Sequence, residues 1–293
     1  MSERSRTRKI QWWKRQAILP LLLFFLWACG DSGNAEPGIT LKKNARKVQV
    51  IAHRGAAGLA PENTLAAVKK GLETQADYIE VDVHQSKDGE VVVIHDPTVD
   101  RTTNGTGRVA DLTLAELKKL DAGSKLDSAF AGERIPTLAQ VLRAVKGKKK
   151  LLIELKKGEE DYYSGLEEKT IQLIRENRAE DWCVLQSFYD PILDRIWKAD
   201  FVIPTQKLII GKIPFLPVFI DHELKFGSFD RYSEATAINV HRFFASKAFI
   251  TSLHNQGFKT FIWTEDEPQN IQKLFQMGAD GVMTNHPELI KRQ

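Results

Sequence analysis

The chain has 293 residues, of which 42% are hydrophobic and 27% charged, a composition typical of a globular protein with one large core or two small ones. Its formal net charge is +4, but residues 1–28 contribute +5 (six basic residues and one Glu), so the remainder is near −1. Since the positive excess belongs to a segment that we expect to be removed, the charge gives no support for nucleic-acid binding.

The first 28 residues are typical of a secretory signal peptide. Six basic residues between positions 4 and 15 precede an uncharged apolar run from Ala17 to Ala28. A run of about twelve residues spans about 18 Å as a helix, whereas the hydrocarbon core of a membrane is about 30 Å thick. We therefore expect residues 1–28 to be cleaved, because an uncleaved membrane anchor would have to include polar flanks.

The sequence around Cys29 resembles the lipobox of bacterial lipoproteins, in which a small residue precedes a lipidated cysteine. It reads Leu26-Trp27-Ala28-Cys29-Gly30. We expect Cys29 to be lipidated, residues 29–46 to form a flexible polar tether, and the protein to be anchored at an extracytoplasmic membrane face. The alternative is an ordinary cleavage site that contains a cysteine. Cys183 is then the one free thiol, expected in the core, and no disulfide framework is possible.

Apolar segments of strand length alternate with helical patterns along the rest of the chain. The expected strands are residues 48–52, 78–83, 151–155, 183–187, 206–210, 237–240, 260–263 and 281–283. The expected helices are residues 64–73, 138–145, 167–177, 191–199, 246–256 and 268–277. This alternation predicts a parallel sheet, and eight units within residues 47–293 fit a closed (β/α)8 TIM barrel. An open doubly wound sheet is the alternative, but no glycine-rich phosphate loop opens a helix.

Residues 90–95 break this pattern. They are strand-like, but only residues 86–89 separate them from the preceding strand, whereas a parallel crossover needs a dozen or more residues. We expect an antiparallel return through a hairpin that turns at Asp88-Gly89. Residues 84–136 are therefore interpreted as a small insertion after the second barrel strand, with a short helix over residues 114–120.

Three carboxylates are candidate metal ligands. Glu80 and Asp82 lie two residues apart in an expected strand, so their side chains face the same side. Glu154 lies at the end of the third barrel strand, and strand ends converge on one rim of such a barrel. These acids would provide an all-oxygen site suited to Ca²⁺ or Mg²⁺. The alternative is an exposed edge with the acids facing water.

His53 and His95 also fall at expected strand ends. Two histidines fit a reaction in which one proton is removed and another supplied near neutral pH, whereas either one alone would more often be structural. Arg54 and Lys156 are suited to hold the negative oxygens of a phosphate. Together with the spaced carboxylates, these residue types indicate metal-assisted attack on a phosphate ester.

Several motifs in a fixed order resemble the signature of the glycerophosphodiester phosphodiesterase family. They are His53-Arg54-Gly55, Pro61-Glu62-Asn63-Thr64, Glu80-Val81-Asp82, His95-Asp96, Glu154-Leu155-Lys156, Trp263-Thr264 and Asp280-Gly281. The resemblance covers roughly residues 48–291, and several separated motifs are far more specific than one. One departure is Asn285, where the family pattern has Asp; we interpret this position as structural.

The resemblance implies a TIM barrel that hydrolyses a glycerophosphodiester to glycerol 3-phosphate and an alcohol with a divalent cation. It also implies that His53 and His95 are the catalytic pair, for which we propose the base and the acid respectively. Glu62 is placed beside the metal as a second-tier residue, although capping of a helix at Asn63 or Thr64 is a sufficient structural reason for this motif.

Two other functions remain open from the sequence. The first is phospholipase D-like hydrolysis of lysophospholipids, for which the apolar segment Ile213 to Ile220 could contact lipid. The second is a catalytically silent lipoprotein that binds phosphorylated ligands. An intact His53 and His95 argue against the silent binder, because binding needs no proton-transfer pair.

Overall fold

The computed structural model describes residues 38–41, 48–199, 202–213 and 216–292. The expected signal peptide and Cys29 lie outside these ranges, as does the expected tether apart from residues 38–41. Residues 37–293 form one compact unit. No helix within the described ranges is long and apolar enough to cross a membrane.

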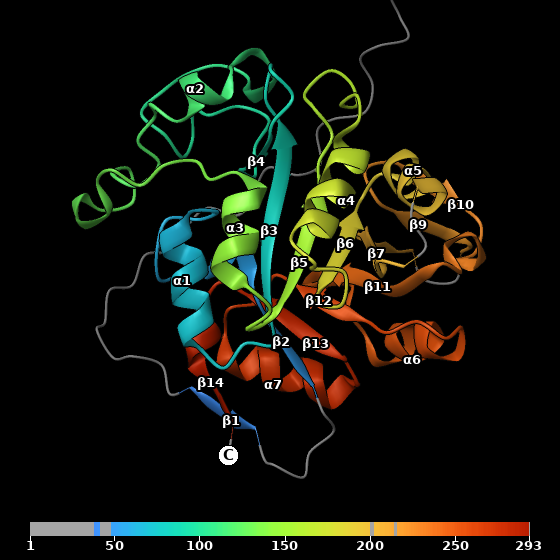
Figure 1. Ribbon diagram of the computed structural model, residues 1–293. Helices are drawn as coiled ribbons and strands as arrows, with labels where there is room; N and C mark the ends of the chain where they lie inside the picture. Colours follow the sequence, from blue (N-terminus) through green and yellow to red (C-terminus); the bar gives the residue numbers. More distant parts are fainter. Residues whose placement is uncertain (1–37, 42–47, 200–201, 214–215, 293) are drawn as a thin grey trace, which may run out of the picture. The chain divides into compact units, whose positions relative to one another are not determined.

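Eight parallel strands close into the predicted (β/α)8 barrel (Figure 1). They are β2 (Gln49–Ala52), β3 (Tyr78–Gln85), β5 (Lys150–Leu155), β6 (Cys183–Ser187), β7 (Thr205–Ile209), β11 (Ala235–His241), β12 (Phe261–Trp263) and β13 (Gly281–Thr284). The order around the barrel is β2-β13-β12-β11-β7-β6-β5-β3, and the pairing of β2 with β3 closes it. The prediction of a TIM barrel is confirmed.

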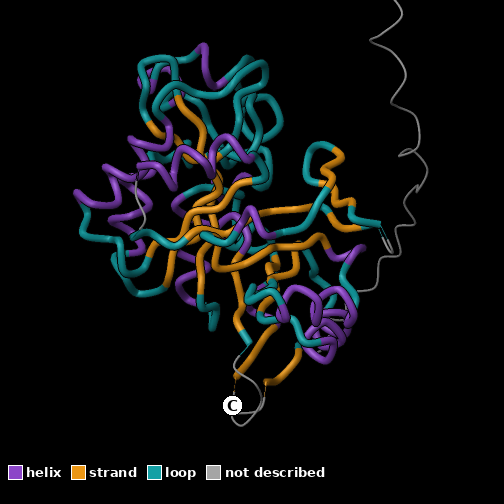
Figure 2. Tube along the Cα trace, turned by 90° about the vertical axis from the view of Figure 1, so that its right-hand side faces the viewer, coloured by secondary structure: helices purple, strands orange, loops and turns teal. Residues whose placement is uncertain are grey.

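Helices cover the outside of the barrel (Figure 2). They are α1 (Leu65–Glu73), α3 (Leu138–Val145), α4 (Leu166–Glu176), α5 (Asp190–Ala199), α6 (Lys247–Asn255) and α7 (Pro268–Met277). Hydroxyl side chains cap several of their first turns: Thr64, Thr137 and Ser246 each accept a hydrogen bond from a backbone N–H three residues later. The apolar stripe of each helix packs against the outer face of the sheet in one continuous core.

The side chains inside the barrel change from apolar to polar along the strands. Near the strand beginnings, a cluster of seven residues fills the interior: Ile51, Tyr78, Leu152, Val184, Ala237, Phe261 and Met283. Two residues further along the same faces lie polar side chains, such as Glu80 after Tyr78 and Glu154 after Leu152. Polar groups are therefore carried to the carboxyl ends of the strands, the rim where reactions occur in this fold.

An insertion follows β3, as expected. The strand β4 (Val91–Val93) returns antiparallel to β3, with Val83 opposite Val93 and Gln85 opposite Val91. The insertion has its own small core, which includes Val92, Val99 and Leu117. Its helix α2 (Leu114–Leu117) is shorter than the expected 114–120 and begins with a capping box at Thr113.

Besides β4, five short strands of the described residues lie outside the barrel. β1 (Ile39–Leu41) pairs in parallel with β14 (Ile290–Arg292). β8 (Gly211–Lys212), β9 (Val218–Ile220) and β10 (Leu224–Phe226) form a small antiparallel sheet after β7. In this sheet Val218 and Phe219 are buried, whereas Phe226 is 81% exposed. Within the apolar segment Ile213 to Ile220, Phe219 thus packs into the main hydrophobic core.

Candidate active site

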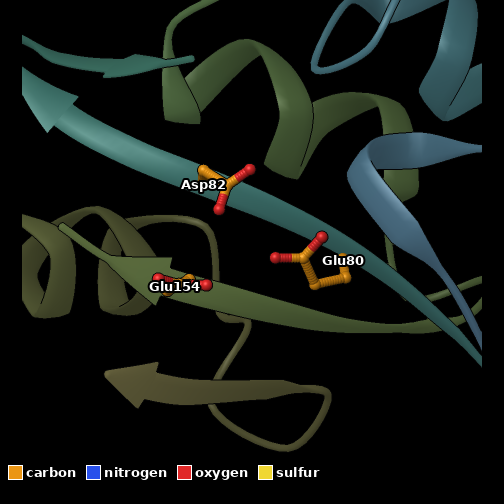
Figure 3. A group of neighbouring side chains, drawn as sticks. All are labelled: Glu80, Asp82 and Glu154. Carbon is orange, nitrogen blue, oxygen red and sulfur yellow. The ribbon is translucent and has the colours of Figure 1, made fainter. Parts of the chain in front are cut away.

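Glu80, Asp82 and Glu154 form an acidic cluster, as expected from their spacing (Figure 3). β3 supplies the first two and β5 the third, with Asp82 directly opposite Glu154 in the strand register. One carboxylate oxygen from each lies within 4.8 Å of the others, and all three side chains are buried. Oxygen Oε1 of Glu80 is buried without a hydrogen-bond partner. A buried, unsatisfied oxygen among carboxylates fits the donor set of a hard divalent cation.

Burial and mutual repulsion raise the pKa values of two members of the acidic cluster. Burial raises the pKa of Glu154 to about 7, with the Asp82 charge adding to the effect and Lys156 opposing it. Burial, reinforced by the charges of Asp82 and Glu154, also raises the pKa of Glu80 well above its usual value. Burial acts on Asp82 in the same direction, but Lys156 and the neighbouring His95 and Arg54 outweigh it and hold its pKa low. The site therefore takes up protons unless another cation replaces them.

Lys156 and Arg54 provide positive charge beside the cluster. The Lys156 ammonium lies 2.9 Å from Asp82 Oδ1 and 2.5 Å from Glu154 Oε1. Arg54 has a left-handed φ of 50°, and its backbone N–H donates to Glu80 Oε2 at 2.8 Å. Its guanidinium Nε lies 3.6 Å from Asp82. Both cations are thus held beside the acidic cluster.

His53 is held in one tautomer by Asn285. Its Nδ1 lies 2.7 Å from the Asn285 side-chain oxygen, while the Asn285 amide nitrogen donates to Asp266 at 2.8 Å. Since the amide oxygen faces His53, a neutral imidazole carries its proton on Nδ1 and leaves the lone pair of Nε2 free. Burial and the charge of Arg54 lower the pKa of His53 to about 4, so the ring is neutral near pH 7. Our interpretation of Asn285 as merely structural was incomplete.

His95 has a charged partner instead. Its Nδ1 lies 2.6 Å from the Asp96 carboxylate, which Arg101 holds in turn through its Nε at 2.6 Å. Burial lowers the pKa of His95 below its ordinary value, although the carboxylates of Asp82 and Asp96 oppose this effect. The two predicted histidines therefore have different surroundings: an amide beside His53 and a carboxylate beside His95.

Glu62 binds the arginines rather than the acidic cluster. Its carboxylate accepts from Arg54 at 2.8 Å and from both terminal nitrogens of Arg101 at 2.7 Å. The neighbouring Asn63 contacts the cluster, since its amide nitrogen donates to Asp82 Oδ2 at 2.8 Å. Thr64, not Asn63, caps the helix. Asn63 and Arg101 were missed from the sequence, although Asn63 stands inside one of the quoted motifs.

Comparison with known proteins agrees with this geometry. The chain matches the model of the glycerophosphoryl diester phosphodiesterase family over residues 53–289. It is 41% identical over 241 residues to the Bacillus subtilis protein YhdW, covering 82% of this chain and 96% of that protein. It is 39% identical over 250 residues to the glycerophosphodiester phosphodiesterase of Caldanaerobacter subterraneus, covering 83% and 96%.

A solved structure shares the fold. The Oleispira antarctica phosphodiesterase in complex with the product sn-glycerol-3-phosphate superposes with a TM-score of 0.70 at 30% identity, covering 82% of this chain and 94% of that one. The family model spans most of the chain, and relatives that align over most of its length are more than 30% identical to it. This chain therefore belongs to the glycerophosphoryl diester phosphodiesterase family.

Proposed function

We propose that this protein hydrolyses glycerophosphodiesters to glycerol 3-phosphate and an alcohol with the help of one divalent cation. The observation that carries the proposal is the convergence of the acidic cluster, two cations and two histidines on one rim of the barrel. The family assignment and the glycerol 3-phosphate bound to the Oleispira antarctica relative support the substrate class.

Glu80, Asp82 and Glu154 would hold the cation, and their oxygen donors favour Ca²⁺ or Mg²⁺ over zinc. When bound, such a cation neutralises charge on the phosphate and lowers the pKa of a coordinated hydroxyl. Arg54 and Lys156 bind the remaining phosphate oxygens. Lys156 now contacts two members of the cluster, so it exchanges carboxylate contacts for phosphate contacts when the site is loaded.

His53 acts as the general base and His95 as the general acid. The free Nε2 of His53 accepts the proton of the attacking glycerol 2-hydroxyl, because the Nδ1 proton of His53 is directed to Asn285. Loss of the alcohol leaves a cyclic phosphate, which water then opens to glycerol 3-phosphate. His95 donates to the oxygen of the leaving alcohol. Its Asp96 partner stabilises the protonated imidazole, as a carboxylate does and an amide does not. Glu62 and Arg101 act as positioning residues that tie Arg54 and Asp96 together.

A second candidate is phospholipase D-like hydrolysis of lysophospholipids. The favouring observation is apolar exposure on the sheet β8–β10, where Leu216, Leu224 and Phe226 are 51%, 58% and 81% exposed. Such side chains could contact an acyl chain at a lipid surface.

A substrate panel separates these functions. The purified protein is incubated with glycerophosphocholine, glycerophosphoethanolamine and a lysophospholipid, and the products are identified by phosphorus NMR. We expect glycerol 3-phosphate from the soluble diesters. Lysophosphatidic acid as the main product would favour the second candidate, and no product from any substrate would favour a silent phosphate-binding lipoprotein.

Export and anchoring are a separate proposal that rests on the sequence pattern of residues 1–46. Residues 1–28 are a cleaved signal peptide, and Cys29 carries the lipid. The tether that we expected over residues 29–46 is shorter, because Ile39–Leu41 pairs with β14 and belongs to the domain. The protein is then anchored at the extracytoplasmic face of a bacterial membrane.

A further inference from the structure

A dense group of positive charges lies far from the active site. Residues 143–150 include Arg143, Lys146, Lys148, Lys149 and Lys150 and contain no acid. They join the end of α3 to the start of β5, and therefore lie at the end of the barrel where the strands begin (Figure 1). The acidic cluster lies at the opposite end of the same strands. We call these five residues and Arg178, which follows α4, the basic patch.

The charges of the basic patch are largely unsatisfied. Arg143, Lys146, Lys148, Lys150 and Arg178 are exposed, and none has a carboxylate within 4 Å in the described part of the chain. At the active site, by contrast, the cations are paired with acids. A pair of acids, Glu180 and Asp181, lies in the adjoining segment and leaves four of the six cations in surplus. Unpaired surface cations are available to an anionic partner.

The basic patch is also hollowed. A depression of about 510 Å³ lies between the ends of α3 and α4. It is lined by Leu142, Arg143, Lys146, Asn177, Arg178 and Trp182. Three cations beside a partly exposed tryptophan are suited to phosphate headgroups at a membrane interface, where tryptophan is favoured.

The strand β1, near the first described residues of the chain, lies on the same side of the barrel as the basic patch. The Lys149 ammonium donates to the carbonyls of Thr74 and Ala76, next to Asp77. Asp77 also pairs with Arg292 of β14, and Arg292 lies opposite Leu41 of β1. β1 and β14 therefore lie at the same end of the barrel as the basic patch. Gly38 lies nine positions after Cys29 in the sequence, and nine residues span at most about 30 Å.

We propose that the basic patch docks on the anionic phospholipid headgroups of a membrane and so turns the active-site rim toward the aqueous side. The chain after residue 28 has a charge near −1, so the attraction is confined to this face and orients the molecule rather than merely concentrating it. An active site directed away from the bilayer receives soluble diesters. Binding to the headgroups does not depend on the proposed catalytic function or on lipidation.

Sedimentation with vesicles tests this proposal. Residues 37–293 are used, because they contain every described helix and strand and the whole described core. We expect binding to vesicles that contain phosphatidylglycerol, little binding to pure phosphatidylcholine, and weakening by salt. The triple variant Lys146→Gln, Lys148→Gln, Lys150→Gln should bind the anionic vesicles about a hundredfold more weakly, at about fivefold per charge.

The matched control removes three exposed lysines elsewhere, as Lys87→Gln, Lys119→Gln, Lys247→Gln. It should bind nearly as well as the wild type. Equal loss in both triple variants, or equal binding to the two kinds of vesicle, would overturn the proposal. Tighter binding to duplex DNA than to anionic vesicles at the same ionic strength would also overturn it. Hydrolysis of soluble diesters should be unchanged in both variants, so failure of docking and failure of the proposed catalysis are distinguishable.

Discussion

Replacement of Glu154 by glutamine should stabilise the metal-free protein at alkaline pH while removing metal binding. The folded-state pKa of Glu154 is about 7, above its unfolded value of 4.5. The neutral carboxyl therefore contributes stability that is fully present below about pH 4.5 and is lost as the pH rises through 7. A shift of 2.5 units, at about 1.4 kcal/mol per unit, corresponds to roughly 3 kcal/mol. The neutral amide of Glu154→Gln avoids this loss.

Urea unfolding in excess chelator at pH 5 and pH 8 measures the effect. The free energy of unfolding of the variant, relative to wild type, should increase by about 2.5 kcal/mol between these pH values, because a small part of the effect is already lost at pH 5. Saturating Ca²⁺ or Mg²⁺ should stabilise the wild type at pH 8 and leave the variant almost unchanged. Glu159→Gln, on an exposed loop, controls for the loss of one negative charge. A difference between Glu154→Gln and wild type that is the same at both pH values would refute the reasoning.

Three further outcomes are expected. Alanine at either His53 or His95 should lower kcat by about a hundredfold or more with a smaller effect on KM, and steady-state kinetics showing a change in KM alone would contradict the assigned roles. Lys207 is fully buried between two carboxylates, so Lys207→Met should destabilise the fold by about 3–5 kcal/mol in urea unfolding; a near-neutral result would show that the ion pairs contribute little. Cys29→Ala should abolish fatty-acid labelling and membrane attachment in a bacterial host, and full labelling would exclude lipidation at this residue.

The barrel and the acidic cluster were predictable because both depend on local periodicity. Alternating strands and helices predict the fold, and the two-residue spacing of Glu80 and Asp82 places them on one face of β3. The hydrogen bond between His53 and Asn285 joins residues 232 positions apart, so no local pattern indicates it. The sequence indicated only that Asn285 departs from the family pattern. The contact with His53 becomes visible in the structure, where β13 pairs with β2.

The hydrogen bonds of Arg54 and Arg101 with Glu62 could not be predicted for a similar reason. Arg101 lies in the insertion, 39 residues from Glu62, and reaches it only because the insertion folds back over the rim. The insertion has irregular connections rather than a repeating helix or strand pattern, so its side-chain directions cannot be read from periodicity. The contacts of the Glu62 carboxylate with Arg54 and Arg101 therefore could not be predicted.

Metal-dependent hydrolysis at the acidic cluster is tested by combining metal titration with product measurement. The purified protein is freed of metal with chelator, and Ca²⁺ or Mg²⁺ is added back in steps while glycerol 3-phosphate released from glycerophosphocholine is measured. We expect no release without metal and recovery that saturates at one bound cation per chain, with neither recovery nor binding in Glu80→Gln. Full activity of the exhaustively chelated protein, with no metal found by elemental analysis, would contradict it.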